Sequence, residues 1–245
     1  MSRVFLIGGG WREYGTPLYR RFLEAAVRDG SRSIAVIAAS GSDNAAENIA
    51  RFREGLLAAG CSLAEMTELI VSADEPLTRE MLEAANATGI FVCGGLTPDY
   101  YDSLCVDQKW LGFVSEKNIP YCGFSAGASI AAREAVIGGW LRNTGDRNIE
   151  IADENAAEDV EMLLVKIGLG LVPFSVEVHA TQWGTLTRLL HAVDARLTEE
   201  GWAIDEDTML EYHNGEISVH GAGSVYRVYR ANDGIGLEIK TAEST

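Results

Sequence analysis

The chain has few cysteines, and those present lack the spacing that disulfide frameworks and zinc sites need. Only four occur in 245 residues, and two of them, Cys93 and Cys122, fall in expected strands. Paired Cys-x-x-Cys spacings would be needed for a zinc site or a stapled secreted scaffold. Cys61, Cys93, Cys105 and Cys122 are therefore interpreted as buried, reduced thiols, as in a cytoplasmic protein.

Long apolar runs are also lacking. No stretch approaches the ~20 apolar residues that a membrane span requires, so no membrane partner is expected. The N-terminal run at 4–7 is too short for a signal peptide and lacks a cleavage site of small residues. A first β-strand is the better interpretation of this segment.

Basic residues are scarce relative to acidic ones. The chain has 20 Lys and Arg against 36 Asp and Glu, a formal net charge of −16. A nucleic-acid-binding protein would carry a basic patch, so nucleic acid is not expected as a partner. The simple meaning of the charge is a well-solvated surface.

The signatures of cofactor binding are absent as well. Gly8-Gly9-Gly10 follows the first strand as a dinucleotide loop would, but Trp11-Arg12-Glu13 follows in place of the third glycine. There is no Walker pattern and no metal-spaced cluster of His and Cys. The sequence thus predicts neither a cofactor nor a metal ion.

Strand and helix patterns alternate through the first two thirds of the chain. Strands are expected at 4–7, 33–39, 64–71, 90–93 and 120–124, and helices at 17–28, 43–59 and 78–87. Continuous apolar strands separated by helices predict an α/β fold whose mostly parallel sheet has helices on both faces. Right-handed crossovers then bring the C-terminal ends of these strands to one edge of the sheet.

The last third is expected to differ in character. Residues 140–161 are polar and acidic, and they are interpreted as a flap over the site. A strand at 175–179 and a helix at 184–197 follow, and 202–230 is expected to add antiparallel strands at one edge. With no repeat and no linker, residues 1–245 form a single expected domain.

One segment carries the clearest chemical signal. Gly123-Phe124-Ser125-Ala126-Gly127-Ala128 lies between an expected strand at 119–122 and a helix start at 126–132. A nucleophile elbow needs this setting, because a sharp strand-to-helix turn exposes the serine hydroxyl. Ser125 is the predicted nucleophile, and the amide of Ala126 is a predicted oxyanion donor. The alternative is a turn that serves packing alone.

A nucleophilic serine needs a base, and the chain has four histidines. His179 ends an expected strand, so it can reach the edge where Ser125 lies. His191 falls inside a helix, whereas His213 and His220 fall in C-terminal hairpins. His179 is therefore the predicted base.

The base in turn needs an orienting acid. Asp205, Glu206 and Asp207 directly follow a short strand at 202–204, and Glu134 is expected in the helix after the elbow. The pattern does not separate these four. A Ser–His–acid order would differ from the Ser–acid–His order of α/β-hydrolases.

A second oxyanion donor is expected at a neighbouring strand end. Gly94-Gly95-Leu96-Thr97 follows the strand at 90–93, and glycine lets a backbone amide approach a substrate closely. Gly95 and Leu96 are predicted to complete the oxyanion hole, and Thr97 to contact substrate.

Together these residues resemble the dipeptidase E and cyanophycinase group of serine peptidases. The resemblance runs through most of the chain, and it is most specific at the Ser125 elbow and at Asp205-Glu206-Asp207-Thr208. Further markers are 6–10, 94–95, 168–173, His179 with 188–190, and 221–225. It implies a glutamine-amidotransferase-like fold with three αβα layers and a triad of Ser125, His179 and Glu206. It also implies hydrolysis of short peptides beside an aspartyl residue, no cofactor and a homodimer.

Departures from the family pattern fall on residues that would bind substrate. Glu177 and Val178 replace an Asp-Gln pair, while Trp183 and Thr185 stand where arginines are expected. Of the arginines only Arg188 remains, and Leu96 replaces a polar residue after the Gly-Gly turn. Each lost hydrogen bond to a charged group is worth roughly 1.5–3 kcal/mol, so the usual acidic substrate should bind far more weakly.

The leading hypothesis is therefore a serine peptidase for a small peptide or isopeptide, with altered specificity and with Thr97, Glu177, Val178, Trp183 and Arg188 near the substrate. One alternative is a catalytically silent binding protein on the same scaffold. Another is an esterase or acyltransferase in which Asp205 and either His213 or His220 serve as partners.

Overall fold

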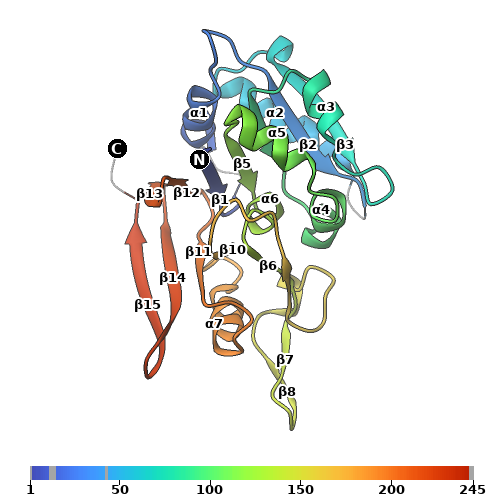
Figure 1. Cartoon of the computed structure of the whole chain (residues 1–245). Helices are drawn as coiled ribbons and strands as arrows, with labels where there is room; N and C mark the ends of the chain where they lie inside the picture. The colour runs from blue at the N-terminus through green and yellow to red at the C-terminus, as the bar shows by residue number, and fades with distance from the viewer. Residues whose placement is uncertain (1, 11–14, 42–43, 243–245) are drawn as a thin grey trace.

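A seven-stranded mixed sheet forms the centre of the part of the chain that the structure describes (Figure 1). The computed structural model describes residues 2–10, 15–41 and 44–242. The strand order is β13-β12-β1-β5-β4-β2-β3, in which β1 to β5 run parallel and β12 and β13 are antiparallel. The bounds are β1 Val4–Ile7, β2 Ile34–Ala39, β3 Met66–Val71, β4 Gly89–Val92, β5 Tyr121–Phe124, β12 Thr208–His213 and β13 Glu216–Gly221.

The inner parallel strands β1, β2, β4 and β5 lack charged residues because helices cover both of their faces. Every residue of β1, β2, β4 and β5 is buried. β3 lies at the edge of the sheet and is only partly buried, with the side chain of Ile70 half exposed. The expected α/β fold with a mostly parallel sheet is confirmed.

Two helical layers enclose this sheet. Their helices are α1 Gly15–Ala25, α2 Ala45–Ala58, α3 Arg79–Ala84, α4 Thr97–Leu104, α5 Trp110–Lys117 and α6 Ala126–Ser129. Phe91 of β4 packs against Phe22 of α1 and Phe52 of α2, with ring centroids 5.9 and 5.5 Å apart. The next residue, Val92, points to the other face, where it approaches Gly127 of α6. A strand between the helical layers thus contributes alternate side chains to the packing on both faces of the sheet.

The sequence placed most of these elements within a few residues but missed two helices. α4 and α5 occupy 97–117, where no helix was expected. The helix expected at 43–59 begins at Ala45, and residue 43 lies outside the described part of the chain. A 3₁₀ turn at Leu63–Glu65 precedes β3. No helix in the described residues is long and apolar enough to cross a membrane.

The helix after the elbow is much shorter than expected. α6 ends at Ser129, so placing Glu134 in this helix was wrong: Glu134 begins strand β6, Glu134–Gly138. The reason is that the carbonyls of Ile130 and Ala131 accept hydrogen bonds from the chain at Leu169 and Leu171. Backbone acceptors engaged by another segment cannot continue the helix.

A second sheet lies toward the lower left of the molecule in Figure 1. It has the order β10-β11-β14-β15, and α7 packs against it. The bounds are β10 Ser175–Val178, α7 Leu186–Asp194, β11 Glu200–Ile204, β14 Ser224–Ala231 and β15 Gly234–Thr241. The C-terminal strands therefore do not all join one edge. β12 and β13 extend the main sheet, while β11 pairs in parallel with β10.

The flap, residues 140–161, leaves the main body after β6 (Figure 1). β6 pairs with β9, Leu164–Ile167, and the hairpin of β7, Leu141–Asn143, and β8, Asn148–Glu150, projects outward. A 3₁₀ turn at Glu154–Ala156 brings the chain back. The polar segment is thus an excursion from the main body, as the sequence predicted.

All four cysteines are buried and free, which agrees with the interpretation as thiols. Burial raises the pKa of Cys105 to about 12 and raises the pKa of Cys93 and Cys122 well above the usual thiol value. These thiols are therefore protonated at neutral pH.

Replacing Gly127 tests the tight contact beneath the elbow. A Cβ at this position would lie 2.5 Å from the carbonyl oxygen of Val92, which is backbone and cannot rotate away. We expect Gly127→Ala to lower the free energy of unfolding by about 2 kcal/mol or more. Gly112 is the matched control in α5, where a Cβ meets nothing nearer than 3.9 Å. Gly112→Ala should raise the free energy by about 0.5–1 kcal/mol, and urea denaturation measures both. Equal effects would contradict the contact.

Candidate active site

Ser125 stands at the turn between β5 and α6 with a backbone conformation that side chains rarely adopt. Its φ is 50° and its ψ −112°, and its own carbonyl accepts the amides of Ala128 and Ser129. Strain of this kind costs about 1–3 kcal/mol and persists where the surroundings enforce it. The strained residue is the serine itself, whereas neither Gly123 nor Gly127 has a positive φ.

The flanking glycines serve close approach instead. A Cβ on Gly123 would lie 2.3 Å from the carbonyl oxygen of Gly127, and a Cβ on Gly127 would meet the end of β4. Both glycines therefore let α6 begin directly over the sheet. The result is a serine hydroxyl presented at the C-terminal edge of β5, as an elbow requires.

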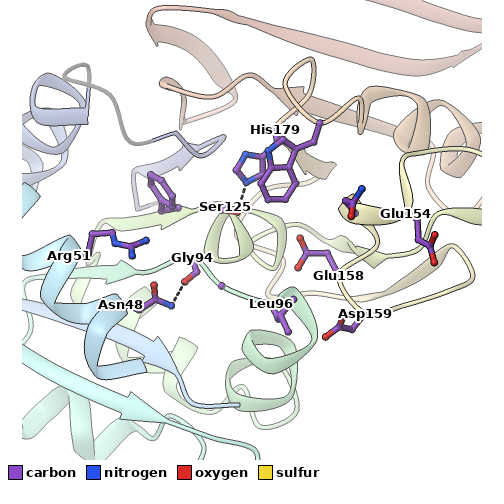
Figure 2. Close-up of a pocket in the computed structure, with 13 residues that line it drawn as sticks. Asn48, Arg51, Gly94, Leu96, Ser125, Glu154, Glu158, Asp159 and His179 are labelled. Carbon is purple, nitrogen blue, oxygen red and sulfur yellow. Dashed lines mark hydrogen bonds between the residues drawn. The ribbon is translucent and has the colours of Figure 1, made fainter. Parts of the chain in front are cut away.

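His179 follows β10 and lies beside the serine (Figure 2). Its Nε2 is 2.8 Å from Ser125 Oγ. Its Nδ1 is 2.8 Å from Oε1 of Glu206, and because a carboxylate only accepts, Nδ1 carries the proton. Nε2 is then the acceptor for the serine hydroxyl. Ser125, His179 and Glu206 form one hydrogen-bonded chain.

Of the four candidate carboxylates, the structure brings Glu206 to His179. Asp205 instead accepts hydrogen bonds from Thr181, Ser224 and Tyr226. These bonds join the end of β11 to the loop after β10 and to β14. Glu206 itself is held by its amide, which donates to Gln182 at 3.0 Å.

The other two candidates lie elsewhere. Glu134 pairs with its neighbour Arg133 at the start of β6. The amide of Asp207 donates to Gly9, and its side chain lies against Gly10. Neither carboxylate is a hydrogen-bond partner of His179.

The end of β1 positions all three segments of the chain. The carbonyl of Ile7 accepts the amide of Ser125, that of Gly8 accepts His179, and that of Gly9 accepts Asp207, at 2.8–2.9 Å. Gly9 has φ +108°, and a Cβ there would lie 2.0 Å from the His179 ring. The three glycines that resembled part of a dinucleotide loop thus contact His179 and the turn that carries Glu206.

The remaining histidines lie in other surroundings. His220 of β13 bonds to Glu211 of β12 at 3.2 Å, and Arg21 bonds to the same carboxylate. His191 of α7 contacts Arg142 of the flap. His213 ends β12, opposite Glu216. The hydrogen bonds that the structure gives to Ser125 include none from these residues.

Burial sets the protonation of His179. Removal from water lowers its pKa below the ordinary value of 6.5, and the adjacent Glu206 carboxylate opposes this shift. The imidazole is thus neutral at pH 7 and can accept a proton from Ser125.

The indole of Trp183 covers one face of the His179 ring. The two rings are parallel to within 7°, and their centroids are 3.9 Å apart. Trp183 is 44% exposed, whereas His179 is 6% exposed. The indole therefore shields the imidazole while it presents its own surface to solvent.

A pocket of about 510 Å³ opens beside Ser125, and it has an acidic side and a side with Arg51 (Figure 2). Figure 2 shows Arg51 and Asn48 of α2 on one side of Ser125 and three flap carboxylates on the other. We call the latter the acidic wall; it consists of Glu154, Glu158 and Asp159. The lining residues are Asn48, Arg51, Gly94, Gly95, Leu96, Phe124, Ser125, Glu154, Asn155, Glu158, Asp159, His179 and Trp183.

Two of the three predicted oxyanion residues border the same space. Gly95 and Leu96 line the pocket, and Ala126 begins α6 directly after Ser125. The next amide of the loop, that of Thr97, donates to Glu158 Oε2 at 2.8 Å. Burial raises the pKa of Glu158, and this hydrogen bond opposes the rise. Glu158 thus joins the flap to the loop after β4.

Four predicted substrate-binding residues do not line the pocket. Thr97 and Val178 are buried, and Glu177 and Arg188 form a buried ion pair with N–O distances of 2.7 and 2.9 Å. Arg188 also donates to the carbonyl of Ala156 in the flap. The remaining family-type arginine therefore points inward and holds the flap, because Glu177 of β10 offers it a carboxylate inside the protein. Trp183 is the one of the five that reaches the pocket.

No metal site is formed by the residues that the structure describes. Within 2–10, 15–41 and 44–242, no three His, Cys, Asp or Glu side chains are grouped so as to hold an ion. The reactive groups that the structure places together are a serine hydroxyl, an imidazole and a carboxylate, joined by hydrogen bonds in that order.

Comparisons with known proteins identify the fold and the family of the chain. No curated protein matches the chain in sequence. A crystal structure of a peptidase from an acI-B1 Actinobacterium matches with a TM-score of 0.71 and 17% sequence identity, over 100% of this chain and 96% of that chain. At this identity the likeness shows the fold. The profile of peptidase family S51 matches residues 4–220, which is most of the chain. The chain therefore belongs to peptidase family S51 and is a serine peptidase.

Proposed function

We propose that this peptidase hydrolyses a short peptide or isopeptide with Ser125 as nucleophile, His179 as general base and Glu206 as the orienting acid. The observation that carries the proposal is the continuous hydrogen-bonded chain, with 2.8 Å at both links. The chain opens on a pocket large enough for a small peptide. A binding protein without activity would not need this alignment.

The proposed reaction follows the order of the hydrogen bonds. Ser125 Oγ forms a bond to the carbonyl carbon as its proton passes to His179 Nε2, and Glu206 stabilises the imidazolium. The oxyanion lies between the amides of the Gly95-Leu96 loop and of Ala126, at the start of α6. His179 then gives the proton to the leaving amine as the peptide bond breaks. Water then attacks the acyl-enzyme as His179 takes its proton. His179 returns this proton to Ser125 Oγ as the acyl group leaves.

The proposed substrate carries a cationic group toward the acidic wall. Three carboxylates on that side attract an α-amine or a basic side chain, whereas an acidic group there would meet like charge. Trp183 and Thr185 in place of arginines support the same conclusion, since they leave fewer donors for an acidic substrate. The homodimer and the cytoplasmic location that the sequence suggested stay predictions.

Substitutions along the hydrogen-bonded chain test the triad. We expect Ser125→Ala to abolish turnover and Glu206→Gln to lower kcat by about 10³- to 10⁴-fold, because Gln no longer holds the Nδ1–H tautomer. Glu134→Gln is the matched control, since it makes the same change at a carboxylate that does not contact His179. Hydrolysis of a dipeptide and isopeptide panel measures all three variants.

Labelling of Ser125 by a fluorophosphonate provides a second measurement. Unchanged activity in Ser125→Ala would refute the proposed nucleophile. A wild-type protein that neither turns over the panel nor takes the label would be the silent binding protein instead.

The pH dependence of kcat/KM tests the state of His179. Activity needs the neutral imidazole, and burial lowers its pKa, so the acidic limb should lie below pH 6.5. Activity is then full above this limb and is lost as the pH falls through the lowered pKa. Glu206→Gln removes the carboxylate that raises the pKa, so the limb of the residual activity should move to still lower pH. A limb above pH 6.5 would contradict the assignment.

Neutralising the acidic wall tests the proposed substrate charge. For paired substrates that differ only by a basic or a neutral residue, Glu154→Gln should lower the kcat/KM ratio by about 1.4- to 5-fold, because exposed ion pairs contribute about 0.2–1 kcal/mol. Glu150→Gln makes the same change in net charge in β8, outside the pocket lining. Equal effects of the two variants would show that the net charge of the protein, and not a contact with the acidic wall, sets the preference for basic substrates. That outcome would contradict the proposed substrate charge.

A further inference from the structure

The stack between Trp183 and His179 is built by the backbone. The amide of Trp183 donates to the carbonyl of His179 at 3.0 Å, which closes the turn that folds the indole back over the imidazole. The ring planes differ by 7° at a centroid distance of 3.9 Å. The Cε1 edge of the imidazole meets Gly9, so the ring is fixed from two sides. Rotation of the imidazole away from Ser125 would disrupt both contacts.

The energy of such a stack depends on the charge of the imidazole. Two neutral aromatic rings prefer offset or edge-to-face arrangements, as in the core pair of Tyr19 and Phe91 at 89°. A cation over the face of an indole is attracted by the ring quadrupole, and indole is the best of the aromatic faces. A parallel, offset stack suits the neutral ring as well, but the attraction increases when the imidazole over the indole face gains a proton, so the contact stabilises the imidazolium more than the neutral ring.

We propose that Trp183 is a positioning residue that stabilises His179 in the protonated form it takes during the reaction. This inference rests on the proposed function. The proton leaves Ser125 Oγ as its bond to the carbonyl carbon forms, resides on Nε2 and passes to the leaving amine. An interaction that strengthens only while His179 carries the extra proton stabilises the transition state more than the ground state. It therefore lowers the activation barrier.

Other charged groups also face the imidazole. Glu206 at Nδ1 and Glu177 of β10 favour the protonated ring, whereas burial and Arg188 of α7 disfavour it. Glu177 and Arg188 pair with each other, so their effects oppose one another. Trp183 adds to the influence of Glu206. A replacement that keeps an apolar side chain over the ring removes this attraction while burial continues to disfavour the protonated form.

The pH profiles of Trp183→Phe and Trp183→Leu test the proposal. Leu keeps an apolar side chain but has no aromatic ring. Phe keeps an aromatic ring that attracts a cation less strongly than indole does. We expect Trp183→Leu to lower kcat about 3- to 30-fold and to move the acidic limb of kcat/KM to lower pH by roughly half to one unit. Trp183→Phe should restore part of both effects. A loss confined to KM, with an unmoved limb, would overturn the proposal and leave Trp183 as a wall of the pocket.

Fluorescence provides a readout that needs no substrate. A protonated imidazole quenches a stacked indole, so the emission of the wild type minus that of Trp183→Phe should fall on acidification. The midpoint should match the acidic limb, and His179→Asn should abolish the transition. A difference emission independent of pH would overturn the proposal. A clear transition in a protein that hydrolyses no peptide would refute the proposed function while supporting the contact between indole and imidazolium.

Discussion

Three consecutive backbone carbonyls at the end of β1 organise the site. Those of Ile7, Gly8 and Gly9 accept amides from the three segments that carry Ser125, His179 and Glu206. These segments come from two different sheets, and β1 is an inner strand of the main one, between β12 and β5. Side chains cannot reach a shared hydrogen-bonding geometry unless their backbones are fixed first. The short strand β1 supplies that fixed reference, and the glycines after it allow the close approach.

The sequence could predict the parts of the site that depend on local structure. Ser125 and His179 are recognisable because each ends a strand at the edge where such sheets collect their loops. Glu206 is different, because three adjacent carboxylates follow the same strand. Local patterns cannot tell which of them points to the histidine. The resemblance to the family selected Glu206, and the geometry agrees.

The parts that the sequence missed depend on tertiary packing. Glu158 reaches the pocket only because the flap folds back over the loop after β4, and no periodicity in 140–161 foretells that path. Arg188 was expected to meet a ligand, yet its partner is Glu177, eleven residues earlier on a buried strand. The division of the C-terminal strands between two sheets is of the same kind. It depends on pairing between β10 and β11, which local patterns do not encode.

The buried guanidinium of Arg188 has a consequence for how the pocket meets its ligands. It fixes the carbonyl of Ala156, and the pocket residues Glu154 and Asn155 precede that point while Glu158 and Asp159 follow it. The side of the cavity opposite Arg51 is therefore held near its midpoint by the hydrogen bond from the buried Arg188 to Ala156. A preorganised surface loses little freedom on association. A wall held in this way selects among peptides by their fit and does not reshape itself around each one.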